Sequence, residues 1–261
     1  MDSDAESWVS DGPDTWNDFD GEARPWSPIF RAVLDLDVQA LRHELASGVD
    51  INLREDGATP LYFAVNFGSA MAEKRLQERL ECISMLLEAG ASLSNIGRDG
   101  TSLHYAARNE SPAYHPVITL LMESGADVNA VNYFGESVLD SAAESGTAGA
   151  VRMLISAGAV DFDRALDLAI TSGKRRNCAQ LLRAGAALPA VITAPPPWRQ
   201  RPGFPQTRAY IENIRAAGGY TAYEKAHRQR LTVIFLEKFP ALPVEMLGRV
   251  VEFTWDIGGH S

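Results

Sequence analysis

The side chains that most often act as catalysts or metal ligands are present in this sequence, but they are not grouped. The five histidines lie far apart, without the spacing of a metal site: His43, His104, His115, His227 and His260. Adjacent acids such as Glu55 and Asp56 lack a surrounding pocket that would adapt them to acid–base catalysis. No phosphate-binding loop, zinc-protease helix or nucleophile-elbow pattern occurs. The sequence therefore predicts no enzyme, no metal site and no cofactor.

Two cysteines and one basic run complete the list of reactive or strongly charged features. Cys82 and Cys178 fall within segments of helical apolar spacing, which favours buried free thiols in a reducing compartment over a disulfide. Lys174-Arg175-Arg176 is interpreted as a solvated helix face, with nuclear import or an anionic contact as the alternative.

Charge and hydropathy restrict the class of partner. The 261-residue chain has a net charge of −10, and residues 1–24 hold eight acids and one arginine. An acidic protein repels phosphate backbones, so nucleic acid is not expected as the main ligand. The opening residues do not resemble a signal peptide, and no apolar run is long enough to span a bilayer. We expect an intracellular protein, cytoplasmic or nuclear, that is monomeric.

The elements that position these side chains repeat along the chain. A Ser-Gly or Ala-Gly pair closes a predicted helix five times, at Gly48, Gly90, Gly125, Gly158 and Gly185. Apolar residues precede four of these glycines by seven, four and three positions: Ile83/Leu86/Leu87, Ile118/Leu121/Met122, Val151/Leu154/Ile155 and Cys178/Leu181/Leu182. A second pattern places an alanine three residues after Ile29, Leu61, Leu103, Leu139 and Leu166. These patterns predict five stacked helix pairs.

The repeated segments resemble ankyrin repeats. The resemblance rests on DGATPLYFAV (56–65), DGTSLHYAAR (99–108) and GADVNA (125–130), and it covers five units. It implies an all-α, ankyrin-type helical solenoid with short hairpin fingers. Thr59 is expected to cap a first helix with Pro60 in its first turn, and His104 to bind the finger loop.

The spacing of the glycines indicates where the units depart from the family pattern. Gly48 and Gly90 are 42 residues apart, and the excess lies in 70–82, predicted to be a charged helical extension. Gly158 and Gly185 are 27 residues apart, which predicts a truncated finger in the fifth unit.

Four segments are expected. Residues 1–26 form an acidic disordered tail, although Trp26 can instead cover the first repeat. Residues 27–189 hold the five repeats, 190–206 form a proline-rich linker and 207–261 a small C-terminal helical segment. In the last segment, Thr221-x-x-Glu224 predicts a capping box at the start of a long helix.

The predicted function is that of a protein–protein interaction scaffold, which binds a partner protein through the concave face of fingers and first helices. Two alternatives stay open: a ubiquitin-ligase substrate adaptor acting through a SOCS- or F-box-like C-terminal segment, and a transcriptional cofactor acting through the acidic tail.

The family resemblance places the partner-binding residues at finger tips and at the ends of first helices. In the second repeat these are Asp56, Ala58, Asn66 and Phe67, and in the third repeat they are Arg98, Arg108 and Asn109. In the fourth repeat they are Tyr133, Phe134, Glu136, Glu144 and Ser145. Tyr133 and Phe134 are either binding anchors or residues that pack against the neighbouring finger.

Overall fold

The computed structural model describes residues 26–66, 75–95, 100–238 and 246. This part of the chain is mainly helical and contains no extended strand, and its isolated antiparallel bridges include Glu55 with Ala58 and Val131 with Ser137. The predicted all-α class is thereby confirmed. The chain forms two compact units, residues 1–106 with 113–127 and residues 107–112 with 128–261.

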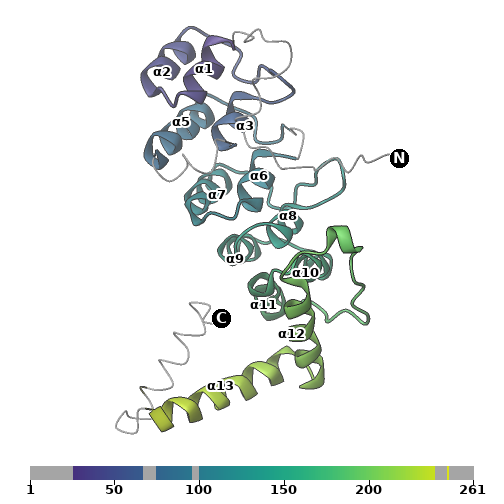
Figure 1. Cartoon of the computed structure of the whole chain (residues 1–261). Coiled ribbons are helices and arrows are strands. Elements are labelled where there is room, and N and C mark those ends of the chain that lie inside the picture. Colours follow the sequence, from purple (N-terminus) through teal and green to yellow (C-terminus); the bar gives the residue numbers. More distant parts are fainter. Residues whose placement is uncertain (1–25, 67–74, 96–99, 239–245, 247–261) are drawn as a thin grey trace, which may run out of the picture. The chain divides into compact units, whose positions relative to one another are not determined.

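The first unit is built from pairs of helices, each with a short first helix and a longer second helix (Figure 1). The pairs are α1 (Pro28–Leu34) with α2 (Val38–Ala46), and α3 (Pro60–Val65) with α5 (Leu76–Glu88). Helix α6 (Ser102–Arg108) follows and is joined to α7 (His115–Glu123) by the 3-10 turn η2 (Pro112–Tyr114). First helices α1 and α3 pack on one another, and second helices α2, α5 and α7 pack in a row.

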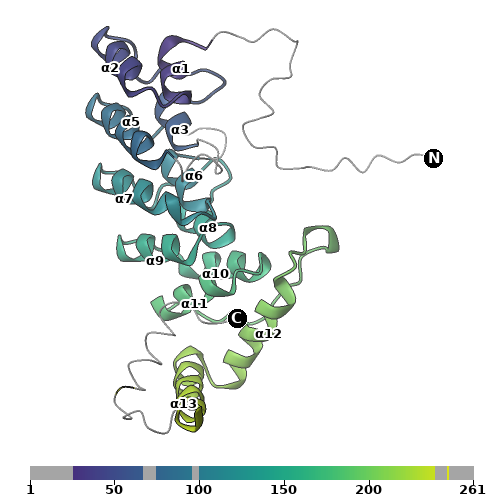
Figure 2. The ribbon, with the colours of Figure 1, turned by 60° about the vertical axis from the view of Figure 1, so that its left-hand side comes forward.

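The second unit continues the same pattern and adds two further helices. Its pairs are α8 (Val138–Glu144) with α9 (Ala148–Ser156), and α10 (Phe162–Thr171) with α11 (Arg175–Ala184). The 3-10 turn η3 (Pro197–Arg199) then leads to α12 (Phe204–Ala216) and α13 (Tyr220–Lys238). Helix α12 packs on α10 and α11, and α13 packs on α11 and α12 (Figure 2). The last pair of repeat helices is therefore covered by α12 and α13.

The helix ends follow the chemistry that the sequence indicates. Thr59 accepts a hydrogen bond from the backbone N–H of Tyr62 at 3.3 Å, with Pro60 in the first turn of α3, as predicted. At the other end, Gly48, Gly90, Gly125, Gly158 and Gly185 all have positive φ. A residue with a Cβ is strained in that conformation, which explains why glycine closes each second helix.

The predicted core is largely confirmed. The leading apolar residues of first and second helices are buried, with Leu61, Leu121 and Leu154 at 0% exposure. One position of the pattern is wrong in three units, because Leu87, Met122 and Ile155 are half-buried rather than part of the core. A residue three positions before the glycine stands at the edge of the apolar stripe, where its side chain reaches solvent.

The charged extension predicted before Gly90 contains the largest correction. Arg79 is 0% exposed, although it lies in a segment of charged residues. Its Nε donates to the carbonyl of Ala64 at 3.1 Å and its Nη2 donates to the carbonyl of Val65 at 2.7 Å. The guanidinium carbon lies 4.1 Å from the centre of the Tyr114 ring. Arg79 therefore closes the C-terminal end of α3, whose last carbonyls have no partner within the helix.

Asn177 on α11 closes the end of α8 in the same way. Its side-chain nitrogen lies 3.0–3.1 Å from the carbonyl oxygens of Ala142, Ala143 and Gly146, at the end of α8. The residue is 2% exposed, so these carbonyls cannot turn to water instead.

Aromatic packing closes the start of the first unit. The Trp26 ring lies 5.7 Å from that of Phe30 and 5.2 Å from that of Phe63, and the latter two are 5.3 Å apart. The backbone N–H of Ser27 donates to the Glu55 carboxylate, which holds this entry segment against the next repeat. Trp26 thus covers the first repeat, one of its two expected roles.

The boundaries of the C-terminal helices differ from those expected. Helix α12 begins at Phe204, inside the segment 190–206 expected to be a linker, because the buried Phe204 side chain packs with the core. Helix α13 begins at Tyr220, so Thr221 stands within it and the predicted capping box does not start the helix. Gly219, with a φ of 119°, precedes it directly. The rest of the predicted C-terminal helical segment, 239–261, lies outside the described residues except for Met246.

We predict that Arg79→Ala lowers the free energy of unfolding by about 2–5 kcal/mol, because it leaves two buried carbonyls without a donor. Arg75→Ala, one turn earlier at the start of α5, is the matched control. Arg75 also bonds backbone carbonyls, at Asp35 and Leu36, but its side chain is 39% exposed. Its loss should cost less than about 1 kcal/mol in urea unfolding followed by circular dichroism. Similar losses for both variants would contradict a special role of Arg79.

Candidate functional site

The finger of the fourth repeat is a short turn held by one buried asparagine. The Asn132 side-chain oxygen accepts the backbone N–H groups of Phe134 at 2.9 Å and of Glu136 at 3.0 Å. Its side-chain nitrogen donates to the Glu136 carboxylate at 2.9 Å. The Asn132 backbone also binds Glu136 and Gly135, the latter with a φ of 71°. Asparagine favours such turns because its side chain replaces backbone partners.

This turn presents two aromatic side chains to solvent. Tyr133 is 72% exposed and Phe134 is 73% exposed, and Val131 beside them is 53% exposed. Moving a large apolar side chain out of water lowers the free energy of the protein. Two adjacent aromatic side chains that stay exposed are therefore unusual for residues whose role is packing. Neither ring takes part in an aromatic contact within the described residues.

The base of the finger is tied to the helices behind it. Arg164 on α10 donates to the Gly135 carbonyl at 2.6 Å, and its Nε lies 3.4 Å from the Asp140 carboxylate. Asp140 in turn accepts the backbone N–H of Ser137, whose hydroxyl accepts the N–H of Asp140 in a capping box. The C-terminal side of the turn is therefore fixed to α8 and α10.

A second bridge fixes the segment that leads into this finger. The Asn129 side chain donates to the Gly158 carbonyl and accepts the backbone N–H of Val160, both at 3.1 Å. Val160 is itself 54% exposed, which adds an apolar side chain to this part of the second unit.

The finger of the second repeat is a tight turn with one exposed acid at its tip. Glu55 and Ala58 exchange backbone hydrogen bonds at 3.0–3.1 Å around Asp56 and Gly57. Asp56 is exposed and has a φ of 48°. Ala58 is 7% exposed, so its side chain offers little surface to a partner.

The remaining candidates at the ends of first helices fall into two groups. Arg108 and Glu144 are exposed. Asn66, Asn109 and Ser145 are half-buried, and each takes part in a local turn or helix end. Asn109 accepts the backbone N–H of Ser111 at 2.9 Å, and the Ser145 carbonyl accepts Lys174 at 3.1 Å. Glu136 is half-buried and bound to Asn132. Phe67 and Arg98 lie outside the described residues.

Two features of the site are missing from the residues singled out by sequence. Asn132 and Arg164 carry no apolar pattern, and their roles depend on contacts between segments. The capping box could have been predicted from the sequence, since Ser137 and Asp140 stand three positions apart at the start of an apolar run.

Both cysteines and His104 are buried. No group of three or more His, Cys, Asp or Glu side chains among them could hold a metal ion. Both cysteines are buried and free. Burial raises the pKa of the Cys82 thiol to about 11 and also raises that of Cys178, so both are protonated at neutral pH. His104 is buried and its Nδ1 accepts the backbone N–H of Thr101 at 3.2 Å, the structural role expected for it.

Comparison with known proteins gives a consistent family. A model described as "Ankyrin repeats (3 copies)" matches residues 29–132 and 103–189. The chain is 33% identical over 169 residues to the B-cell lymphoma 3 protein homolog of Mus musculus, covering 61% of this chain and 34% of that protein. It is 35% identical over 118 residues to Ankyrin repeat and SOCS box protein 11 of Homo sapiens, covering 45% of this chain and 32% of that protein. The matched parts thus span about a third of these relatives.

We predict that Asn132→Ala loosens the finger without unfolding the helices. Removing the side chain leaves the N–H groups of Phe134 and Glu136 without their acceptor, so their hydrogen exchange should accelerate by about tenfold or more. Tyr133→Ala is the control, because it changes the neighbouring residue and keeps every one of these bonds. Unchanged exchange in Asn132→Ala would show that the turn does not depend on this side chain.

Proposed function

Because the chain belongs to the ankyrin repeat family, we propose that it binds a partner protein with Tyr133 and Phe134 as the principal anchors. Ankyrin repeats are protein-interaction modules, and the sequence carries five of them by its glycine pattern. The observation that supports this choice is the exposure of two adjacent aromatic rings on a turn fixed by Asn132.

Burial of apolar area and a low loss of conformational entropy both favour binding at this finger. Aromatic side chains carry large apolar surfaces and are enriched among the residues that dominate binding energy. A turn that is already ordered loses less conformational freedom when a partner binds. The finger therefore offers apolar area without the entropic cost of ordering a flexible loop.

Exposed charged residues on each unit would add specificity to the contact made by the two aromatic rings. Within the second unit, Glu144 stands exposed at the end of α8. Within the first, Asp56 at the second finger is a separate exposed contact point. Both are charged, and such positions at the rim of an interface affect partner choice more than affinity.

The composition of the chain supports an intracellular setting in cytoplasm or nucleus, with a protein rather than nucleic acid as the main ligand. Two free, buried cysteines suit a reducing compartment. Separately, none of the described helices is both long enough and apolar enough to cross a membrane.

We predict that Tyr133→Ala combined with Phe134→Ala weakens partner binding by about 2 kcal/mol or more and leaves the melting temperature nearly unchanged. Isothermal titration calorimetry and thermal unfolding measure the two quantities. Val160→Ala, which removes another exposed apolar side chain of the same unit, controls for a general loss of surface. If the melting temperature falls in parallel with affinity, the rings are packing residues. Unchanged affinity would move the contact to another surface.

A second candidate function is that of a ubiquitin-ligase adaptor. One relative is named as an ankyrin repeat and SOCS box protein, and the chain continues beyond its repeats with a further apolar segment, LPVEMLGRVVEF (242–253). In that case this segment would recruit a second protein while the repeats hold a substrate. The third candidate, a transcriptional cofactor acting through residues 1–26, stays a prediction, since residues 1–25 lie outside the described part.

Replacing Leu242 and Leu247 by aspartate tests the adaptor candidate. The adaptor account predicts that purified ubiquitin-ligase scaffold subunits bind the full chain and that the double variant no longer retains them. Tyr133→Ala with Phe134→Ala should leave this association intact, because neither residue belongs to the segment 242–253. Equal retention by the wild-type chain and the aspartate variant would exclude this role for the segment.

A further inference from the structure

The helices after the fourth repeat carry a charge opposite to that of the protein as a whole. Residues 174–238 contain twelve Lys or Arg residues and three Asp or Glu residues, in a chain of net charge −10. This segment includes α11, α12 and α13, all in the second unit. Such a concentration of one sign creates a local positive potential on an acidic protein.

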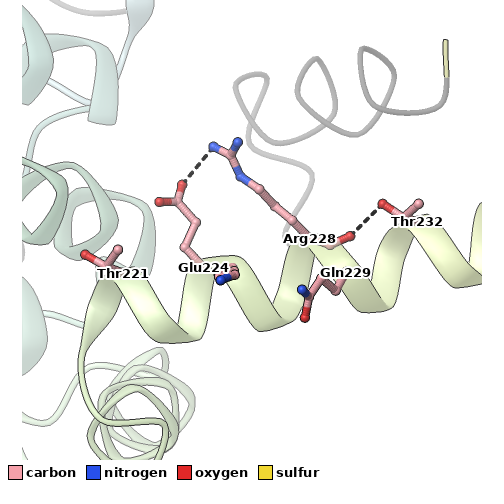
Figure 3. A pocket seen from close by; sticks show the side chains of 6 residues that line it. Thr221, Glu224, Arg228, Gln229 and Thr232 are labelled. Atoms are coloured by element: carbon pink, nitrogen blue, oxygen red, sulfur yellow. Dashed lines mark hydrogen bonds and ion pairs between the residues drawn. The ribbon is translucent and has the colours of Figure 1, made fainter. Parts of the chain in front are cut away.

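The few acids of this segment are mostly occupied by neighbouring arginines. Glu212 pairs with Arg208 at 2.9 Å. Glu224 pairs with both Arg183 at 3.1 Å and Arg228 at 3.2 Å, and the pair with Arg228 on α13 is visible in Figure 3. These carboxylates are therefore committed to other cations and do not neutralise the rest of the segment.

Three arginines on adjoining helices are left without an acidic partner among the described residues. They are Arg175 and Arg176 at the start of α11 and Arg230 on α13. The Arg175 guanidinium lies 4.9 Å from the centre of the Tyr210 ring, and its buried Nε has no hydrogen-bond partner in the described part. Arg176 and Arg230 are exposed.

Arg175 and Arg230 converge on the same residue from different helices. Burial lowers the pKa of His227, and the positive charges of Arg230 and Arg175 lower it further. Tyr223 stacks on His227 with ring centres 6.0 Å apart, and it contacts Tyr210 at 5.6 Å. Aromatic packing thus orders the surroundings of the two arginines, and the acids nearby, Glu110 and Glu224, pair with other cations among the described residues.

The start of α11 adds to this imbalance. The positive end of a helix dipole lies at its N-terminus, where acids are favourable and cations are not. Helix α11 has two arginines in its first turn, no acid there, and no side chain that caps it. Glu110 pairs with Lys174 at the N-cap of α11, so an anion bound at this point would compensate Arg175 and Arg176, for which no such pair is formed in the described part.

We propose that Arg175, Arg176 and Arg230, called here the basic surface, bind a short acidic polypeptide segment of a partner protein. Charge complementarity defines the ligand as carboxylate-rich. Nucleic acid is the less favourable occupant, because the rest of the chain holds twelve basic and 31 acidic residues and repels a long polyanion. A short peptide can contact the basic surface and avoid that repulsion. This surface shares no residue with the fourth finger, so the inference goes beyond the proposed function.

A fluorescent peptide with the sequence of residues 1–24 is a suitable probe, because it holds eight acids, one arginine and two tryptophans. Anisotropy titration with the full chain at low ionic strength measures its affinity, which should fall steeply as salt is added. The same titration uses a full-length variant whose own eight acids in 1–24 are replaced by Asn or Gln, so that they do not compete with the probe.

The decisive variant is Arg175→Glu, Arg176→Glu and Arg230→Glu together, expected to weaken probe binding by about tenfold or more. Its matched control is Arg31→Glu, Arg42→Glu and Arg152→Glu, three exposed arginines elsewhere with the same change in net charge. The control should lose much less affinity. If the first variant loses helical circular dichroism, the Arg→Gln triple at the same positions replaces it.

Four outcomes would overturn the proposal. The first is that the probe binds neither the wild-type chain nor its neutral-tail variant, and the second is that both arginine triples lose the same affinity. The third is that a probe with its acids changed to amides binds equally well. The fourth is that a single-stranded oligonucleotide of the same length binds as tightly as the peptide. The last outcome would assign the basic surface to nucleic acid.

Discussion

The carbonyl groups at the ends of the short first helices are the constraint on which this structure depends. Helix α3 has six residues and α8 has seven, so most of their carbonyls find no partner within the helix. These ends are buried, and an unpaired buried carbonyl costs free energy comparable to a lost hydrogen bond. Arg79 on α5 and Asn177 on α11 donate hydrogen bonds to these carbonyls. The helices that pack on one another therefore also supply the donors that these helix ends lack.

The fingers are stabilised by the same device, applied to a turn. Asn132 supplies the acceptor and donor that the turn lacks, and Arg164 fastens it from α10. These contacts account for the shape of the finger without any contribution from the side chains of Tyr133 and Phe134. The two rings bury little surface in the described structure, so folding does not explain their presence. Binding is the function that gives exposed aromatic area a favourable free energy.

Local patterns were sufficient to predict the helices and most of the core, because apolar spacing and glycine caps act within a few residues. Arg79 was missed because its charged neighbours indicate a solvated face. It nevertheless stands four positions before Ile83, on the same helical face, which was the available signal. Asn132 and Arg164 could not be found in this way, since their partners depend on the folded turn. The exposure of Tyr133 was left open for the same reason, because sequence does not show whether a neighbouring segment covers a ring.

The central claim is that Tyr133 meets a partner protein, and site-specific photo-crosslinking in the native host tests it most directly. A photoreactive phenylalanine analogue replaces Tyr133 in one variant and Arg152, an exposed residue of α9, in another. The account predicts that irradiation joins position 133 to one defined protein and leaves position 152 without that adduct. Absence of an adduct at position 133, or the same set of adducts at both positions, would contradict it.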